Sequence, residues 1–387
     1  MKAAIVLVAA MLASVAPVPA IAQAYWAEPA ADDFAYDINA VQAPWSKADI
    51  DVSHHDRIYV SDPTSTKIVV IDPAAGNELG WIDLSKSGMA EPSFSSPNVQ
   101  RLAAARDGRT VATLATRSVT LVDLAKNTER GRTVFETSPT AVAFTPNGHE
   151  LWVSLGHEHA IAVVDPKTAR EITRIPAKGG VGATILSPNG RYAFVSLTAK
   201  PSILVVDVAH RRIVGHVAST GAGAGAIAVS PDGKQIWATR RESGTTTVFA
   251  AKPPFAVREV IKTGPATDAV NFAQRADDSF AYVSVGGDRP AIKVYRTDSL
   301  EAVTTVPLQA APTAVWPSGD GTRIYASLAG TNKVAAIDTL TYTTASTIPI
   351  STDAQNLIYV PGAVRSGKGL ANLVPSGRDA ALALAAR

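Results

Sequence analysis

The stretch TPNGHELWVSLGHEHAIAVVDPKTAREITRIPA, from Thr145 to Ala177, decides the fold because the chain repeats it. Similar stretches begin with SPNGRYAFVSL at Ser187 and SPDGKQIWATR at Ser230, and weaker copies contain RDGRTVATL, SGDGTRIYASL, SHHDRIYVSD and RADDSFAYVSV. Intervals of 40, 42, 43 and 88 residues, the last spanning two units, separate the turn glycines Gly108, Gly148, Gly190, Gly233 and Gly321. Seven copies therefore fit between about Lys47 and Ser351.

The pattern inside each unit predicts four short strands. A short apolar run such as AVAF meets an Asn-Gly or Asp-Gly turn, whose residues accept the positive φ of tight hairpins. A strand such as LWVSL, a variable loop, a β-branched strand such as ILVVD and a last strand such as RIVGHVAS follow. Four strands in about 42 residues, repeated without a helical period, are typical of a propeller blade. We predict an all-β fold, a seven-bladed β-propeller of four-stranded antiparallel blades, over residues 47–361.

Two segments compete for the innermost strand of the first blade. ADIDVS (48–53) precedes the first copy, whereas AQNLIYVP (354–361) follows the last copy and resembles the inner strand TAVAFTP. Either segment would close the ring, and closure removes exposed sheet edges. The sequence leaves open whether the C-terminal segment replaces or supplements the N-terminal one.

The units resemble the YVTN-type β-propeller repeat, in which a V-x-V-I-D strand and an SPDGK-x-[VI]-[YW]-V hairpin recur. The best matches are AVSPDGKQIWATR, ILSPNGRYAFVSL and NKVAAIDTLTYTTASTIPI, within a resemblance that runs from about Asp51 to Ser351. This resemblance implies an exported bacterial protein with seven radial blades. It implies no single reaction, since relatives include binding and surface proteins, and similar propellers serve as lactonases and as modules of quinone or haem enzymes.

The N-terminal sequence MKAAIVLVAAMLASVAPVPAIAQA is typical of a secretory signal peptide cleaved near Ala22 or Ala24. We therefore predict a periplasmic or secreted protein with a signal peptide over 1–24, an N-terminal extension over 25–46 and a C-terminal tail over 362–387. No later stretch has the roughly 20 apolar residues of a membrane-spanning helix, so we expect no transmembrane anchor. We expect the propeller to be a monomer.

The charge is nearly balanced, with 36 Lys and Arg against 34 Asp and Glu and a net charge of +2. Such a balance gives no long-range attraction to nucleic acid, which counts against a nucleic-acid partner. The chain has no cysteine, which excludes disulfides and a thiol nucleophile.

Repetition separates structural residues from candidate functional ones. Aromatic residues recur in the second strand and are predicted to pack between blades: Tyr59, Trp152, Phe194, Trp237, Tyr282 and Tyr325. Aspartates recur at the end of the third strand and are predicted to accept backbone N–H groups of the next turn: Asp72, Asp123, Asp165, Asp207 and Asp338. Function is therefore expected at residues that one blade alone contains.

Propellers usually bind ligands on the face built from the loops between second and third strands and the links between blades, which we call the loop face. The candidate ligand-binding residues of this face are His157, Glu158, His159, Arg117, Arg240, Arg241, Asp268, Asp288 and Arg289. His157 and His159 lie two residues apart, so both side chains share one side of a strand end. They provide two ligands for a divalent metal such as zinc or copper, which needs a third from another loop. The alternative is a solvated hairpin tip, and no other cofactor is predicted.

Three functions follow from these patterns. The first is a binding or scaffold protein that recognises a protein or a small-molecule ligand on the loop face. The second is a lactonase-like or lyase-type metal-assisted enzyme that uses His157, His159, Arg240 and an aspartate such as Asp268 or Asp288. The third is DNA binding. No Gly-x-Ser-x-Gly, Ser-x-x-Lys or His-Glu-x-x-His motif indicates a particular catalytic reaction.

Overall fold

The computed structural model describes residues 53–85, 101–218, 225–275, 278–365 and 367–376, all within the compact unit 36–387. The predicted signal peptide and N-terminal extension (1–46) lie outside these residues. Across the described ranges, every regular element is a strand, and no helix is long and apolar enough to cross a membrane.

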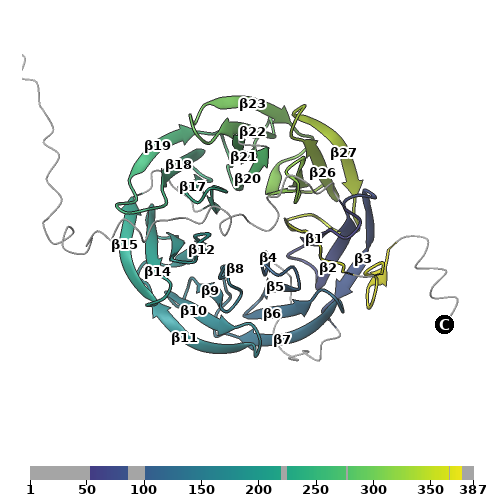
Figure 1. The fold of residues 1–387 in the computed structure, drawn as a ribbon, viewed down its shortest axis with the longest axis horizontal. Helices are drawn as coiled ribbons and strands as arrows, with labels where there is room; N and C mark the ends of the chain where they lie inside the picture. Colours follow the sequence, from purple (N-terminus) through teal and green to yellow (C-terminus); the bar gives the residue numbers. More distant parts are fainter. Residues whose placement is uncertain (1–52, 86–100, 219–224, 276–277, 366, 377–387) are drawn as a thin grey trace, which may run out of the picture. The chain divides into compact units, whose positions relative to one another are not determined.

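The strands form seven sheets arranged as the blades of a propeller (Figure 1). Blade 1 contains, from the inside outward, β28 (Asn356–Val360), β1 (Arg57–Ser61), β2 (Lys67–Asp72), β3 (Asn77–Asp83) and β29 (Val374–Pro375). Blade 2 contains β4 (Arg101–Ala104), β5 (Thr110–Ala115), β6 (Ser118–Asp123) and β7 (Thr128–Val134). Blade 3 contains β8 (Ala141–Phe144), β9 (Leu151–Leu155), β10 (Ala160–Asp165) and β11 (Arg170–Pro176).

The remaining four blades repeat this order from the inside outward. Blade 4 contains β12 (Val181–Leu186), β13 (Tyr192–Leu197), β14 (Ser202–Asp207) and β15 (Arg212–Ala218). Blade 5 contains β16 (Ile227–Val229), β17 (Gln235–Arg240), β18 (Thr245–Ala250) and β19 (Val257–Lys262). Blade 6 contains β20 (Val270–Arg275), β21 (Asp278–Val285), β22 (Ala291–Arg296) and β23 (Ala302–Pro307). Blade 7 contains β24 (Pro312–Pro317), β25 (Arg323–Leu328), β26 (Lys333–Asp338) and β27 (Thr343–Pro349).

The seven inner strands contact one another in sequence around the axis, β28 next to both β4 and β24, which confirms the predicted seven-bladed fold (Figure 1). The hydrophobic core lies between adjacent blades. For example, Ile58 and Val69 of blade 1 pack in one cluster with Tyr325 of blade 7. The second and third strands are therefore buried on both faces, and the fourth strands carry the polar exterior.

Both repeated residue types have the predicted structural role. The second-strand aromatics are buried at no more than 2% exposure: Tyr59, Trp152, Phe194, Trp237, Tyr282 and Tyr325. Trp152 also donates its indole N–H to the Glu150 carboxylate at 2.9 Å. The aspartates bind turn amides as predicted. Asp338, for instance, accepts hydrogen bonds from the N–H groups of Leu340 and Thr341 at 2.8 and 2.9 Å.

Blade 1 is closed from the C-terminal end of the chain. Strand β28, within the predicted segment AQNLIYVP, takes the innermost position and pairs Ile358 with Tyr59. Most of the competing segment, residues 48–52, lies outside the described residues. The chain then crosses the face opposite the loop face, which we call the turn face, and β29 adds a fifth strand that pairs Val374 with Trp81.

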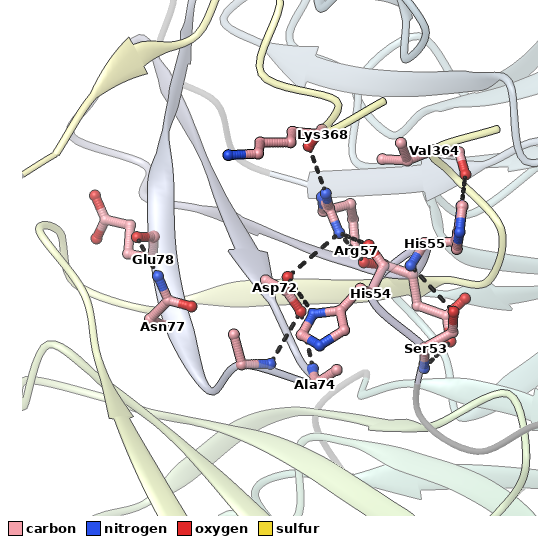
Figure 2. Close-up of polar contacts among 12 residues, drawn as sticks. Ser53, His54, His55, Arg57, Asp72, Ala74, Asn77, Glu78, Val364 and Lys368 are labelled. Carbon is pink, nitrogen blue, oxygen red and sulfur yellow. Dashed lines mark hydrogen bonds and ion pairs between the residues drawn. The ribbon is translucent and has the colours of Figure 1, made fainter. Parts of the chain in front are cut away.

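Polar contacts hold this crossing segment against the turn that precedes β1 (Figure 2). The His55 ring donates from Nδ1 to the Val364 carbonyl at 2.7 Å, and the Val364 N–H donates to the His55 carbonyl at 2.9 Å. The buried Arg57 donates to the Lys368 carbonyl at 2.9 Å. Nearby, His54 contacts Asp72 at 3.0 Å. His54 and His55 therefore lie on the turn face, away from the loop face.

Candidate functional site

A cavity of about 420 Å³ lies inside the ring, lined by residues of the innermost strands. Its wall is mostly small and apolar, and its charged lining residues are Arg101, Arg106 and Asp268. Arg101 begins β4 and Asp268 lies two residues before β20, so both lie at the loop-face end of the cavity. Arg106 follows β4 and lies at the turn-face end. We call the loop-face end the channel mouth.

The backbone around Asp268 fixes this carboxylate between two blades. The Asp268 N–H donates to the Ser284 hydroxyl at 3.1 Å, and the Asp268 carbonyl accepts from the Ala226 N–H at 3.1 Å. The Asp268 carboxylate contacts one guanidinium nitrogen of Arg241 at 3.1 and 3.3 Å. The neighbouring blades therefore position Asp268 before any ligand arrives.

Burial dominates the electrostatics of the channel mouth. It raises the pKa of Asp268 despite the nearby positive charges of Arg241 and Arg101. Arg101 lines the same end of the cavity and is exposed to solvent there; desolvation lowers its pKa although the charge of Asp268 opposes the shift. In both groups the loss of hydration outweighs the opposite charges available in the protein. The channel mouth therefore holds two charges that the protein compensates incompletely.

Arg101 is a site residue that the sequence prediction missed. The first residues of the seven described inner strands are Arg101, Ala141, Val181, Ile227, Val270, Pro312 and Asn356. Arg101 is the one charged residue in this set, so comparison between repeats contains the signal that would identify it. The prediction considered the loops of the loop face and left out the starts of the inner strands.

The His-Glu-His tip between β9 and β10 is a hydrogen-bonded turn. Although burial opposes the shift, hydrogen bonds from Thr137 and the charge of Arg174 lower the pKa of Glu158. The Thr137 N–H and hydroxyl donate to Glu158 at 3.1 and 2.8 Å, and Arg174 donates to its other oxygen. Glu158 thus links the turn to the preceding interblade link and to the outer strand β11.

The two histidines of this tip have different surroundings. His159 has a positive φ of 52° and accepts the Gly180 N–H on its Nδ1 at 2.9 Å. That contact places the proton of a neutral His159 ring on Nε2 and leaves Nδ1 engaged. His157 is exposed. Among the described residues, no group of three or more His, Cys, Asp or Glu side chains is arranged to hold a metal ion.

The other predicted residues are spread over three blades. Arg117 donates its Nε to the Phe135 carbonyl at 3.2 Å in blade 2. Arg240 is 2% exposed at the end of β17, and burial lowers its pKa. Asp288 and Arg289 are exposed between β21 and β22. Of the nine predicted residues, the described contacts join one pair directly, Arg241 and Asp268.

Comparison of sequences identifies no family. No protein-family model matches the chain, and no curated protein sequence matches it.

Comparison of structures gives several similar propellers. Hydrazine synthase of Kuenenia stuttgartiensis has a TM-score of 0.59 and 17% identity, over 69% of this chain and 92% of that chain. The dihydro-heme d1 dehydrogenase NirN has a TM-score of 0.60 and 14% identity, over 79% and 66%. A protein of unknown function from Desulfotomaculum acetoxidans DSM 771 has a TM-score of 0.66 and 12% identity, over 78% and 98%. At these identities the similarity establishes the fold, and the chain is a seven-bladed β-propeller related to them by architecture.

Proposed function

We propose that the protein is a binding protein that takes a small charged ligand at the channel mouth. The observation that carries this proposal is the pair Arg101 and Asp268, whose pKa values burial shifts toward the neutral forms. Perturbed titratable groups in a concave site are typical of functional positions. A ligand with opposite charges would supply the compensation that the surrounding protein lacks.

The chemistry of the channel mouth suits a zwitterion or the charged end of a peptide. The Arg101 guanidinium favours a carboxylate or another oxyanion, which it can bind through two parallel N–H groups. Asp268 favours an ammonium group or another strong donor. The cavity of about 420 Å³ is within the usual range for small-molecule sites, roughly 300 to 1,000 Å³. Its apolar wall would contact the ligand's carbon framework.

The metal-assisted alternative has no comparable support. Its residues come from separate blades: His157 and His159 from blade 3, Arg240 from blade 5 and Asp268 from the link to blade 6. Glu158 is held by Thr137 and Arg174, and His159 uses Nδ1 for a backbone contact. A metal at His157 and His159 therefore stays a prediction.

Thermal unfolding with a ligand panel tests the binding proposal. Glutamate, glycine, succinate and putrescine would each be added at millimolar concentration to the wild type, Arg101→Gln and Asp268→Asn. A ligand at about 100 times its Kd stabilises the folded state by roughly 2.7 kcal/mol, a readily measured rise in unfolding temperature. We expect zwitterionic glutamate or glycine to raise the unfolding temperature of the wild type, and both variants to lose that rise.

Arg258→Gln is the matched control, because Arg258 is exposed on the outer strand β19. It should respond to the ligand as the wild type does. Absence of any rise across the panel, or an equal rise in Arg101→Gln, would contradict the proposal.

Two further assignments belong to this proposal. We propose membership of the YVTN-type repeat proteins, supported by hairpins such as SPDGKQIWATR at Ser230. We also propose export, supported by the signal-peptide pattern of residues 1–24. N-terminal sequencing of the mature protein tests export, and a first residue near Gln23 or Tyr25 is the expected result.

A further inference from the structure

A second, larger cavity opens on the turn face, next to blades 2 and 3. Its volume is about 1050 Å³. The turns that follow β4, β6, β8 and β10 form its walls, together with Ala363, Val364, Arg365 and Gly369 of the crossing segment. We call it the turn-face cleft. It lies at the opposite end of the blades from the channel mouth.

The lining of the turn-face cleft is rich in positive charge. Five basic side chains line it: Arg106, Arg109, Arg130, Lys167 and Arg365. Two acidic side chains, Asp107 and Asp123, accompany them. The whole chain has 36 basic and 34 acidic residues, so this excess is local to the cleft.

Both acidic residues of the cleft are bound by their own turns. Asp107 accepts the Arg109 N–H at 2.9 Å. Asp123 accepts the N–H groups of Ala125 and Lys126 at 3.0 and 3.1 Å, as the other repeated aspartates do. Backbone N–H groups therefore orient both carboxylates, and their two negative charges remain outnumbered by the five basic side chains of the lining.

Three arginines of the cleft have no acidic partner. Within the described ranges, the guanidinium groups of Arg109, Arg130 and Arg365 form no ion pair or hydrogen bond, and all three side chains are exposed. Elsewhere on the molecule, Arg211 and Arg323 each contact a carboxylate. The positive charges around the cleft repel one another. A bound multivalent anion would attract several of them at once and so offset this repulsion.

The floor of the cleft is apolar. Leu124 and Val364 are 3% and 7% exposed, and Phe144 and Pro146 are partly buried beside them. A small inorganic ion would leave this floor uncovered. A ligand with a carbon framework would cover the parts of Phe144 and Pro146 that remain exposed and gain the free energy of apolar burial there.

The crossing segment that supplies Arg365 is fixed in place. Its neighbour Val364 exchanges two hydrogen bonds with His55, through the His55 ring and carbonyl (Figure 2). Arg57 holds the Lys368 carbonyl on the other side of Arg365. Val364 and Lys368 are therefore anchored before a ligand binds, which lowers the ordering cost of binding near Arg365.

We propose that the turn-face cleft binds an organic polyanion, a small molecule with two or more carboxylate or phosphate groups on an apolar framework. The arginines of the rim bind the oxyanions, since each guanidinium matches an oxyanion through paired N–H groups. The apolar floor binds the framework. This site is separate from the channel mouth and does not depend on the function proposed there.

Isothermal titration calorimetry of the full chain at low salt tests this site. Trimesate, with three carboxylates on a benzene ring, is the main probe. Benzoate tests the framework with one charge, and inorganic pyrophosphate tests charge without a framework. We expect trimesate to bind at least about tenfold more tightly than benzoate and more tightly than pyrophosphate, with an affinity that falls as salt is added.

Variants connect the binding to the cleft. Arg109→Gln and Arg365→Gln should each weaken trimesate binding by about fivefold or more, whereas Arg258→Gln on the outer strand β19 should leave it unchanged. All three side chains are exposed, so the unfolding temperatures should match the wild type.

The proposal would be overturned by no binding of trimesate, by affinity for benzoate or pyrophosphate equal to that for trimesate, or by an equal loss in Arg258→Gln. A duplex DNA oligonucleotide that binds more tightly than trimesate and loses affinity in Arg109→Gln would also overturn it, in favour of a nucleic-acid surface.

Discussion

The Tyr359 hydroxyl donates a hydrogen bond to the Asp56 carboxylate, across 303 residues of sequence. Both side chains are 2% exposed, and the second Asp56 oxygen accepts the Gly362 N–H at 2.7 Å. Tyr359 belongs to β28, and Asp56 directly precedes β1. The pair therefore joins the last inner strand to the start of the first blade with a buried, charge-assisted hydrogen bond.

Tyr359→Phe should lower the free energy of unfolding by about 1 to 3 kcal/mol, because it leaves a buried carboxylate oxygen of Asp56 with only the long contact from the Ser53 N–H at 3.3 Å. Urea denaturation measures this change. Tyr342→Phe is the control, since no described residue accepts a hydrogen bond from that hydroxyl, and it should change stability by less than about 0.5 kcal/mol. Equal effects of the two substitutions would show that the hydrogen bond from Tyr359 to Asp56 contributes nothing to the free energy of unfolding.

Gly80→Ala should displace β29 from the edge of blade 1. A Cβ at Gly80 would lie 2.3 Å from the Val374 carbonyl oxygen, and Gly80 has a φ of 141°. Gly76→Ala is the matched control for Gly80→Ala. Gly76 also has a positive φ, of 67°, but a Cβ at Gly76 would meet nothing within 4 Å. Limited proteolysis should release the C-terminal segment faster from Gly80→Ala than from Gly76→Ala, which should show only the cost of strained backbone, about 1 to 2 kcal/mol. Identical cleavage rates would argue against the edge pairing.

Asp338→Ala should cost about 1 to 2 kcal/mol at neutral pH, through loss of the contacts from the turn amides and Arg323. Hydrogen bonds from Thr341 and Leu340, with the charge of Arg323, lower the Asp338 pKa although burial opposes them. A lowered folded-state pKa gives stability that is present above pH about 4 and is lost as the pH falls through the folded-state value. Denaturation at pH 7 and pH 3 should show a smaller difference from the wild type at pH 3. A constant difference would contradict this assignment.

Asp268→Asn should show the opposite pH dependence. Burial raises the Asp268 pKa, so the wild type loses stability as the pH rises from about 4 through the folded-state value, whereas asparagine does not ionise. The unfolding temperature of Asp268→Asn relative to the wild type should therefore increase between pH 3.5 and pH 7. Asp288→Asn, at an exposed loop of the same blade, should show no such trend. A relative decrease for Asp268→Asn would mean that its ion pair with Arg241 outweighs burial.

Much of the fold could be predicted because each blade repeats the same turn residues and the same buried side-chain positions. The Asn-Gly and Asp-Gly turns, the buried second-strand aromatics and the aspartates before the outer turns recur every 40 to 43 residues in the clear copies. Ring closure was harder to predict, since two segments had suitable strand patterns and only long-range pairing distinguishes them. The short strand β29 has no periodic pattern, and contact with Gly80 and Trp81 defines it.

The candidate site was predicted less completely, for a physical reason. Position in the loop face identified Asp268 and Arg241, which do contact each other. The pKa shift of Asp268 depends on burial by neighbouring blades, and only the assembled ring brings Arg101 and Asp268 into the lining of one cavity. The cationic turn-face cleft is likewise invisible in a balanced composition, because Arg109 and Arg365 are 256 residues apart in the chain.

The position of β28 has a consequence for how this protein is made. A ribosome completes β1 through β27 before it reaches Asn356–Val360, so six whole blades can pair while blade 1 still lacks its inner strand. Until then β1 has an open edge, and open edges invite pairing with foreign strands. The last pairing of blade 1 therefore waits until Asn356–Val360 has been synthesised, and a nascent chain cut short before Asn356 would lack this inner strand.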